Sequence, residues 1–264
     1  MRTIFLTIPT LAKVFSDGSF FRRVFLCIQL WFFFLSRKFF RFNHDFLIRC
    51  TCKGIQFPIF LRYPMDIAVL REIYVDREYE WFPTSDPKVI IDLGAHFGDT
   101  ALYYHAQYPE ATIISVEPSP ENFERLKKNT ADIAQIVPVQ AAIGGQDGSI
   151  KLNLGKSSLG YSVVPRDGAT TSIEVPQLTL KTLYAQNGIQ KADLIKFDIE
   201  GGEEALFVTD NPSEFADAYI GEVHEDLISI DSKEFVSRFV DFDIEKVGLT
   251  NPRRFTLKAV RKTK

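Results

Sequence analysis

The stretch IIDLGAHFGDT, residues 90–100, joins an apolar run to a short loop that contains acids and glycines. Asp92, Gly94 and Gly98 follow the spacing D-x-G-x-x-x-G at the end of that run. Glycine lets a backbone turn sharply and approach a ligand closely, so we expect Gly94 to face a bound molecule and Gly98 to permit close packing at a helix start. An acid within such a loop disfavours a phosphate and suits a positively charged part of a ligand.

A further acid stands at a distance that is typical of nucleoside recognition. Glu117 ends the next apolar run, 23 residues after Gly94, close to the ~20-residue offset of acids that accept ribose hydroxyls. Dinucleotide-binding loops carry a middle glycine that makes room for a pyrophosphate, whereas Ala95 and His96 fill that space here. The residues therefore favour a nucleoside with a cationic group, such as S-adenosylmethionine, over a nicotinamide cofactor. A plain strand–turn–helix is the alternative interpretation.

Ionisable residues also gather in DLIKFDIEGGEEALF, residues 193–207. Strand residues alternate faces, so Lys196, Asp198 and Glu200 are predicted to share one side. The strand predicted next to it adds Glu222 and His224, again two residues apart. Charges at the end of a buried strand are costly unless they are paired or used, so we expect these five groups to meet at one cleft. The alternative is an internally paired Lys–Asp–Glu ladder.

These groups suggest how an acceptor would be activated. A hydroxyl that accepts a methyl group must lose its proton to a base. We predict His224 as that base because its unperturbed pKa is ~6.5, with Asp198 and Glu200 as alternatives. Lys196 is expected to orient the acceptor or to pair with Asp198.

The elements that would position these residues alternate between strand and helix from residue 88 onward. Buried strands are predicted at 88–94, 112–118, 136–143, 193–200 and 218–224, and helices at 99–108, from Ser119-Pro120, at 180–187, at 203–208 and at 232–240. Residues 149–180 are predicted to form β-hairpins with turns near Gly155 and Asp167-Gly168, and 242–247 and 255–260 a closing hairpin. This alternation predicts an α/β sandwich around a mostly parallel sheet.

Composition narrows the class of protein further. The 264 residues carry a net charge of −3, but residues 1–53 hold nine basic and two acidic residues, so the body is acidic. An acidic body lacks the basic footprint of nucleic-acid-binding proteins, and no nucleic-acid partner is predicted. Three cysteines make no even disulfide framework and predict a reducing, cytoplasmic location. Cys50 and Cys52 near His44 lack a standard zinc spacing, so no metal site is predicted.

The most apolar run, VFLCIQLWFFFL at residues 24–35, is shorter than the ~20 residues that span a bilayer. Arg22, Gln29 and Ser36 recur every seven residues as a narrow polar stripe, and basic residues flank the run on both sides. Three interpretations stay open. The helix docks on the body or on a second subunit, it lies on an anionic membrane, or it is a membrane anchor.

The body resembles the FkbM-type methyltransferases, a branch of the class I S-adenosylmethionine-dependent enzymes. The matching segments are VIIDLGAHFGDTALYYHAQYP, ISVEPSPENFERLKKN, VQAAIGGQDGSIKL, DLIKFDIEGGEEALF and EVH, with the lead-in LRYPMDIAVLREIYVDREYEW. The resemblance runs from about residue 54 to the end of the sequence. Two positions depart from the family pattern: Phe197 replaces a smaller aliphatic residue, and Lys181 replaces a usual aspartate.

The resemblance implies a seven-stranded sheet with a reversed last strand, and S-adenosylmethionine as cofactor. It implies that Glu117 holds the ribose, that Ala142 borders the adenine, that Asp198 lies near the methionine end, and that Tyr79 closes the pocket. The candidate cofactor-binding residues are Asp92, Gly94, Ala95, His96, Gly98, Asp99, Glu117, Pro118, Ala142, Asp198 and Tyr79.

Three segments are expected: a basic, aromatic, helical start at 1–49, lead-in strands and a helix at 50–87, and the cofactor-binding domain at 88–264. The predicted activity is O-methylation of a hydroxyl on a sugar, glycan or small metabolite. The alternative is a catalytically degenerate cofactor-binding or scaffold protein that the amino-terminal helix recruits to a membrane. A peripheral membrane contact through residues 20–42 and a homo-oligomer are both left open.

Overall fold

The computed structural model describes residues 2–40, 44–81, 83–154, 162–163, 171–208, 211–248 and 253–263, with the side chains of residues 2–5 and 40 left aside. The turns predicted near Gly155 and Asp167-Gly168 fall outside the described residues.

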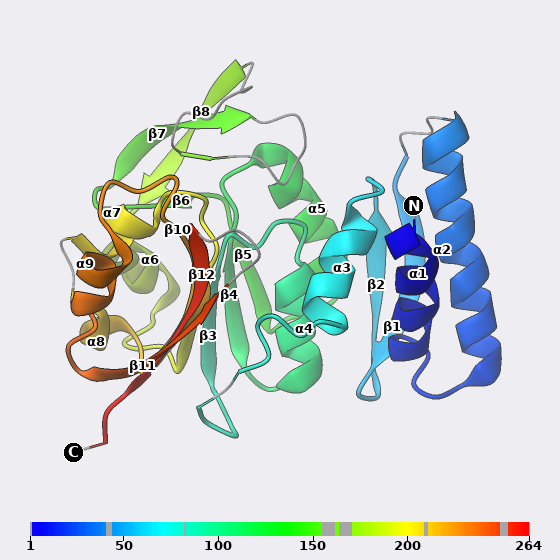
Figure 1. Ribbon diagram of the computed structural model, residues 1–264, viewed down its shortest axis with the longest axis horizontal. Helices are drawn as coiled ribbons and strands as arrows, with labels where there is room; N and C mark the ends of the chain where they lie inside the picture. Colours follow the sequence, from blue (N-terminus) through cyan, green and yellow to red (C-terminus); the bar gives the residue numbers. More distant parts are fainter. Residues whose placement is uncertain are drawn as a thin grey trace.

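A seven-stranded sheet forms the centre of the molecule (Figure 1). Its order is β11-β12-β10-β9-β3-β4-β5. The strands are β3 (Val89–Leu93), β4 (Thr112–Val116), β5 (Ile136–Val139), β9 (Leu194–Phe197), β10 (Ala218–His224), β11 (Phe242–Gly248) and β12 (Arg254–Arg261). The pairs β5–β4, β4–β3, β3–β9 and β9–β10 are parallel, whereas β12 runs antiparallel to both β10 and β11. The predicted mostly parallel sheet with a reversed last strand is confirmed.

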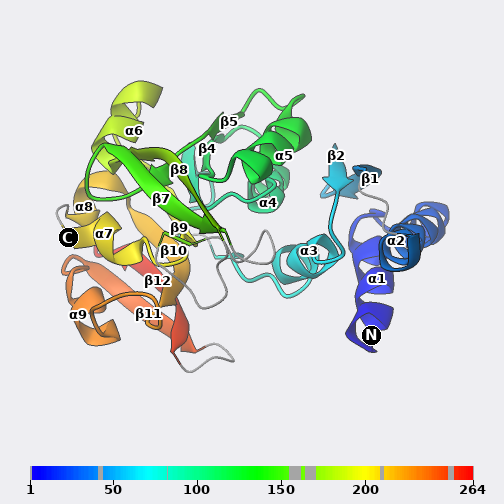
Figure 2. The ribbon, with the colours of Figure 1, turned by 90° about the horizontal axis from the view of Figure 1, so that it is seen from above.

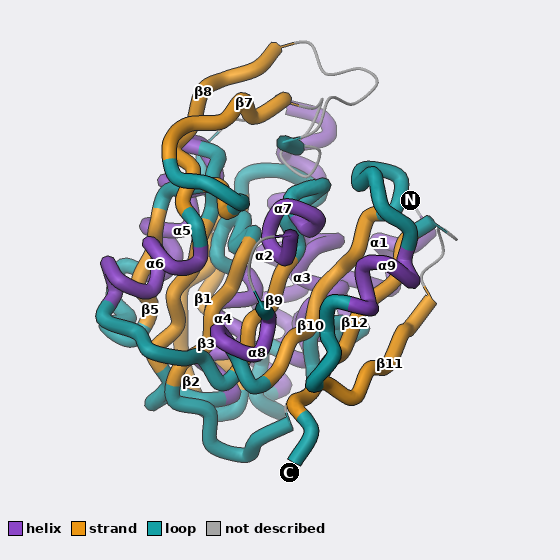
Figure 3. Tube along the Cα trace, turned by 90° about the vertical axis from the view of Figure 1, so that its left-hand side faces the viewer, coloured by secondary structure: helices purple, strands orange, loops and turns teal. Residues whose placement is uncertain are grey.

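Helices cover both faces of this sheet, because its inner strands are apolar on both sides. One face packs against α3 (Asp66–Tyr74) and α4 (Asp99–Gln107), and the other against α6 (Leu180–Asn187), α7 (Glu203–Val208), α8 (Pro212–Phe215) and α9 (Ser232–Ser237). Figure 3 shows the strands side by side. The start predicted for α5 (Pro120–Thr130) is confirmed, since the Ser119 side chain accepts a hydrogen bond from Asn122 N.

The predicted strands at 136–143 and 193–200 differ most from expectation. The run 136–143 is divided between β5 in the main sheet and β6 (Ala142–Ile143), which pairs with β8 (Thr171–Leu178) in a small sheet completed by β7 (Gly148–Leu154). Strand β9 ends at Phe197, because the following backbone turns through left-handed residues at Glu200 (φ 47°) and Gly201 (φ 96°). Asp198 and Glu200 therefore lie in a loop, and strand alternation does not orient them.

The amino-terminal part forms an additional layer on the α3/α4 side. It consists of α1 (Arg2–Val14), α2 (Phe20–Phe40) and the antiparallel pair β1 (Phe46–Cys52) and β2 (Ile55–Leu61). In α2, Leu26, Leu30 and Phe33 are buried in the same core as α3 and α4. The inner face of the predicted helix thus docks on the body, and Figure 2 shows α2 at the outer edge of the molecule. Among the described residues, no helix is both long and apolar enough to cross a membrane.

Candidate active site

The loop between β3 and α4 folds tightly against the ends of the neighbouring strands. Gly94 has a φ of 77°, and a Cβ at this position would lie 1.9 Å from the Asp198 carbonyl oxygen. Only glycine combines that conformation with so close an approach. Gly98 has a φ of 92° at the N-terminus of α4, where a Cβ would lie 3.0 Å from Leu126 Cδ1. The predicted close packing at Gly98 is confirmed.

Glu117, directly after β4, is fixed by hydrogen bonds from the loop after β3 and from the start of α5. Its carboxylate accepts hydrogen bonds from His96 N (2.9 Å), Ser119 N (3.0 Å) and Asn122 Nδ2 (3.4 Å). His96 adopts a φ of 48°, in the left-handed region that non-glycine residues rarely occupy. Burial raises the pKa of Glu117 to about 7, although these hydrogen bonds oppose the shift. Glu117 is thus a fixed, poorly solvated acceptor on the pocket wall.

Asp92 supports this loop from below. It is fully buried, and its Oδ1 lies 3.1 Å from Lys196 Nζ. Lys196 is also buried and donates hydrogen bonds to the carbonyl oxygens of Gly94 (2.9 Å) and Leu93 (3.3 Å). The positive partner of Asp92 is therefore a side chain of the protein. Lys196 was predicted to orient the acceptor or to pair with Asp198, and it pairs with Asp92 instead. This ion pair positions the loop, and of its two members only Lys196 lines the pocket.

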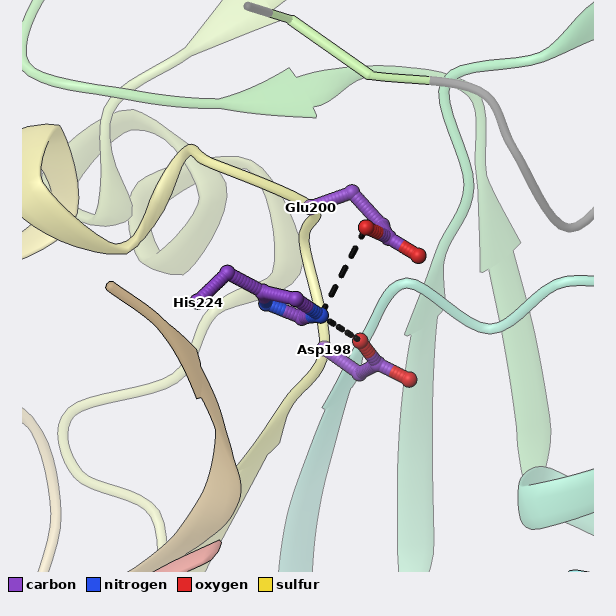
Figure 4. A group of neighbouring side chains, drawn as sticks. All are labelled: Asp198, Glu200 and His224. Carbon is purple, nitrogen blue, oxygen red and sulfur yellow. Dashed lines mark ion pairs between the residues drawn. The ribbon is translucent and has the colours of Figure 1, made fainter. Parts of the chain in front are cut away.

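Four acidic side chains surround His224, the last residue of β10. Its Nδ1 lies 2.6 Å from Glu203 Oε1, and its Nε2 lies 3.2 Å from Glu222 Oε2. Nε2 is also 3.5 Å from Glu200 Oε2 and 3.9 Å from Asp198 Oδ1. Figure 4 shows the carboxylates of Asp198 and Glu200 directed toward the imidazole. The predicted meeting of the ends of β9 and β10 is confirmed for these groups, while Lys196 lies apart from them with Asp92.

The charges in this acidic group are strongly perturbed. Burial lowers the pKa of His224, but the hydrogen bond to Glu203 and the surrounding carboxylates outweigh it and raise the pKa to about 11. Burial, together with the hydrogen bond to Glu222, raises the pKa of Glu78 to about 9, so Glu78 is protonated at neutral pH. Acidic groups therefore crowd this side of the pocket more densely than the sequence alone indicated.

Sequence reasoning missed Glu72, Glu78 and Glu203. Glu72 and Glu78 come from α3 and the loop after it and line the pocket. Tyr79, which was predicted to close the pocket, could have pointed to the adjacent Glu78. The Tyr79 hydroxyl donates a hydrogen bond to Asp198 Oδ2 at 3.2 Å. Glu203 opens α7 and is fully buried, and the signal was the paired acids of GGEE directly after the strand.

The loop after β3, together with Glu117, and the acidic residues after β9 face one pocket. It lies at the carboxyl ends of β3, β4 and β9, where parallel sheets bind their ligands. The predicted residues that line it are Tyr79, Gly94, His96, Asp99, Glu117, Pro118, Ala142, Lys196, Asp198 and Glu200. Asp92, Ala95, Gly98 and His224 do not reach its wall. The structure thus assembles one site from segments more than a hundred residues apart.

Comparison with known proteins identifies the family. A family model described as the methyltransferase FkbM domain matches residues 92–243. Methyltransferase 1 of Beauveria bassiana (strain ARSEF 2860) is 24% identical over 155 residues, 50% of this chain and 62% of that protein. Methyltransferase sdnD of Sordaria araneosa is 26% identical over 168 residues, 51% of this chain and 65% of that protein. The chain therefore spans less than two thirds of the length of these relatives.

Solved structures with a similar fold include the fibrillarin of Aeropyrum pernix in complex with natively bound S-adenosyl-L-methionine. Its TM-score is 0.47 and its identity 15%, over 81% of this chain and 82% of that one. The TYW2 protein of M. jannaschii in complex with AdoMet has a TM-score of 0.42 and 12% identity, over 84% and 89%. The match of the family model to more than half of the sequence establishes that this chain belongs to the FkbM methyltransferase family.

Proposed function

We propose that this protein transfers the methyl group of S-adenosylmethionine to a hydroxyl group of a sugar, a glycan or a small metabolite. The observation that supports this most is one pocket with two differently built ends. Glu117 offers a fixed carboxylate for ribose hydroxyls at one end, and Asp198 and Glu200 offer carboxylates at the other. A cationic sulfonium and a hydroxyl acceptor both suit the acidic end.

The chemistry asks mainly for positioning, because the sulfonium is already a good leaving group. The acceptor oxygen forms a new bond to the methyl carbon as the carbon–sulfur bond breaks, and that electron pair remains on sulfur. Holding the oxygen in line with the methyl group supplies several kcal/mol, up to about 7–11 in the best intramolecular cases. We assign this positioning to Asp198, whose carboxylate is itself oriented by the Tyr79 hydroxyl.

The acceptor hydroxyl must give up its proton, and geometry favours the two carboxylates as its base. Asp198 and Glu200 line the pocket, whereas His224 is fully buried behind them. Sequence reasoning placed His224 first, and the structure favours its alternatives. We propose that Asp198 or Glu200 takes the proton and that His224 and Lys196 act as positioning residues.

Calorimetric titration with S-adenosylhomocysteine, the product of the cofactor, tests the proposal. We expect micromolar binding, equivalent to about −8 kcal/mol, and no binding of NAD in a parallel titration. Purified protein that binds the homocysteine product then justifies a screen of hydroxylated sugars as acceptors. A folded sample that binds neither compound would contradict the proposed activity and favour the alternative of a degenerate scaffold protein.

We also propose that α2 brings the protein to an anionic membrane surface. It exposes many apolar side chains, with Phe21, Phe25, Ile28 and Phe32 each more than half exposed. Patches of this kind on a protein surface mark interaction sites. Basic residues of the same helix, Arg22, Arg23, Arg37 and Lys38, flank the apolar run, which is the charge arrangement of interfacial helices. A second copy of the chain is the competing occupant, and the test below distinguishes the two.

A further inference from the structure

The side chain of His224 is fixed so that one of its two nitrogens points into the acidic group. Nδ1 lies 2.6 Å from Glu203 Oε1, and Glu203 is anchored in turn because its Oε2 accepts a hydrogen bond from Gly201 N at 2.8 Å. Both side chains are fully buried. A carboxylate on one ring nitrogen fixes the tautomer and directs the other nitrogen outward, as it does for histidines that bind metals.

The outward nitrogen, Nε2, is buried. Among the described residues it has charge contacts with carboxylates, the shortest at 3.2 Å to Glu222 Oε2, but no hydrogen bond of good geometry. Oδ1 of Asp198 shares both properties within the described chain. Buried polar atoms are normally satisfied by hydrogen bonds, whereas these two atoms have only charge contacts: with each other at 3.9 Å, and from Nε2 to Glu222 Oε2 at 3.2 Å. A cation held between them, in place of a proton on the imidazole, would satisfy both.

The surrounding donors have the number and spacing of a metal site. One ligand atom each from Asp198, Glu200 and His224 lies within 4.8 Å of the others, and Nε2 is 3.5 Å from Glu200 Oε2 (Figure 4). First-row metal ions bind nitrogen and oxygen ligands at about 2.0–2.2 Å, which separates neighbouring ligands by roughly 3–3.5 Å. Small rotations of the two carboxylates reach that spacing. Glu222 Oε2 lies 3.2 Å from Nε2 and could serve as a fourth metal ligand.

The charge around the site also calls for a cation. Four carboxylates surround one imidazole, and two cationic side chains that interact with them are already engaged: Lys196 with Asp92 at 3.1 Å and Arg254 with Asp226 at 3.2 Å. Glu200 holds its place with a left-handed backbone, at a φ of 47°. Such strain of about 1–3 kcal/mol persists where the surroundings impose it, and it is concentrated at binding sites.

We propose that Asp198, Glu200 and His224 bind a divalent cation of the first transition row, with Glu203 as the outer carboxylate that orients His224. Mixed imidazole and carboxylate donors suit Mn²⁺, Fe²⁺ or Zn²⁺ better than Mg²⁺ or Ca²⁺, which prefer oxygen ligands alone. This site departs from the expectation, drawn from sequence, that the protein holds no metal.

The role of the cation rests on the proposed function. Asp198 and Glu200 line the pocket, so a cation there lies beside the methyl donor and within reach of an acceptor hydroxyl. A metal ion lowers the pKa of a hydroxyl that binds to it. The acceptor proton then leaves to water, and the cation takes over the task assigned above to the carboxylate base. The substrate class is thereby narrowed to acceptors whose hydroxyl is free to coordinate a metal.

Titration with Mn²⁺, followed by the electron paramagnetic resonance signal of the free ion, tests the site without any assay of activity. The full chain is first stripped with EDTA and desalted. We expect one Mn²⁺ per chain, and at least ten-fold weaker binding in Glu200→Gln, which removes one ligand charge at a partly exposed position. Glu204→Gln is the matched control, since Glu204 bonds Ser229 at the protein surface, and it should bind Mn²⁺ like wild type.

Two outcomes would overturn the site: wild type that binds no Mn²⁺ at millimolar concentration, or Glu200→Gln that binds it as tightly as wild type. Circular dichroism and thermal unfolding of each variant establish that it is folded. The same stripped sample is titrated with S-adenosylhomocysteine. If the protein binds S-adenosylhomocysteine but not Mn²⁺, only the metal site is refuted. If it binds Mn²⁺ but not S-adenosylhomocysteine, only the proposed methyl transfer is refuted.

Discussion

Several residues that line this pocket have a strained backbone or a poorly solvated charged group, and both features cost free energy of folding. His96 and Glu200 both adopt left-handed backbone conformations, and both line the pocket. Glu117 is a carboxylate in a poorly solvated position whose pKa is raised to about 7. Strained or desolvated residues gather where a protein binds or reacts, because function and not stability selects them. Their shared location agrees with a cofactor pocket at this edge of the sheet.

Glu117→Gln should alter the pH dependence of stability. The raised pKa means that the folded state holds a proton on Glu117 more tightly than the unfolded chain does, where the pKa is near the ordinary 4.5. This contribution is fully present below about pH 4.5 and is lost as pH rises through about 7. The free energy of unfolding of wild type relative to Glu117→Gln should therefore fall by about 3 kcal/mol over that interval.

Urea unfolding of the two proteins from pH 4.5 to 8 measures this difference. Groups common to both proteins cancel, so a constant difference across the range would show that Glu117 titrates normally. The variant should also bind S-adenosylhomocysteine at least ten-fold more weakly at pH 8, because it removes the charged acceptor for the ribose hydroxyls. Equal affinity in both proteins would count against the ribose assignment.

At the scale of elements, the site exists because β3, β4 and β9 are parallel neighbours and end at the same edge. The loop after β3 is tied to both partners: Gly94 N and Ala95 N donate to the Val116 carbonyl oxygen, at 2.9 and 3.0 Å. Asp198 N donates to the Leu93 carbonyl oxygen at 3.0 Å. Gly94 is the point where this loop meets the backbone after β9, so its lack of a side chain positions both halves of the pocket.

Gly94→Ala should be strongly destabilising. The new Cβ would lie 1.9 Å from the Asp198 carbonyl oxygen, which is backbone and cannot move aside cheaply, and the φ of 77° adds strain. We expect a loss of about 3 kcal/mol or more in the free energy of unfolding, together with loss of cofactor binding.

Gly188→Ala is the matched control for Gly94→Ala, and urea unfolding compares the two. Gly188 ends α6 with a φ of 65° and has open space where a Cβ would stand. It should lose only the conformational term, about 1–2 kcal/mol. Similar losses in the two variants would mean that the contact with Asp198 is not the decisive restraint.

Over the whole molecule, a basic amino-terminal layer lies on an acidic body. The layer shares a hydrophobic core with α3 and α4, so it is an integral part of the fold and cannot be removed without exposing that core. Its outer surface is the exposed face of α2, and Figure 2 shows this helix on the side of the molecule away from the β7/β8 sheet. α3, whose Glu72 lines the pocket, packs directly on α1. Membrane attachment through α2 would therefore be linked to the pocket through α1 and α3.

The triple variant Phe21→Ser, Phe25→Ser, Phe32→Ser should lose membrane binding and keep its fold. Each of these side chains is more than half exposed, so little core is removed, while each phenylalanine buried in a membrane contributes about 1.5–3 kcal/mol. Co-sedimentation with phosphatidylcholine vesicles that contain phosphatidylserine should fall at least ten-fold. Wild-type binding should also weaken in high salt and on neutral vesicles.

Val240→Ser is the control for this experiment, because Val240 is equally exposed on the opposite end of the chain. It should bind vesicles like wild type. Wild type that stays in the supernatant, or a triple variant that sediments equally, would contradict membrane docking. If light scattering finds a wild-type dimer that the triple variant converts to a monomer, the face is instead an interface between copies.

The amino-acid sequence by itself determined the order of the elements and the mostly parallel sheet, and its resemblance to the FkbM family implied the reversed last strand. The element order and the parallel sheet depend on local signals: continuous apolar runs, the cap at Ser119 and glycines at turns. It also brought Asp198, Glu200, Glu222 and His224 to one edge, because parallel strands end together.

Only the tertiary structure decided how those charges are paired. Lys196 pairs with Asp92, its register partner on β3, rather than with Asp198, and His224 is held by Glu203 from the start of α7. The first contact depends on which strand lies beside β9 and in which register, and the alternation of residues along one strand does not give either. The second contact depends on the turn after Phe197, which brings the start of α7 against the end of β10. An ion pair between two elements depends on how those elements pack against each other. Sequence patterns give the position of each residue along its own element but not the relative placement of two elements.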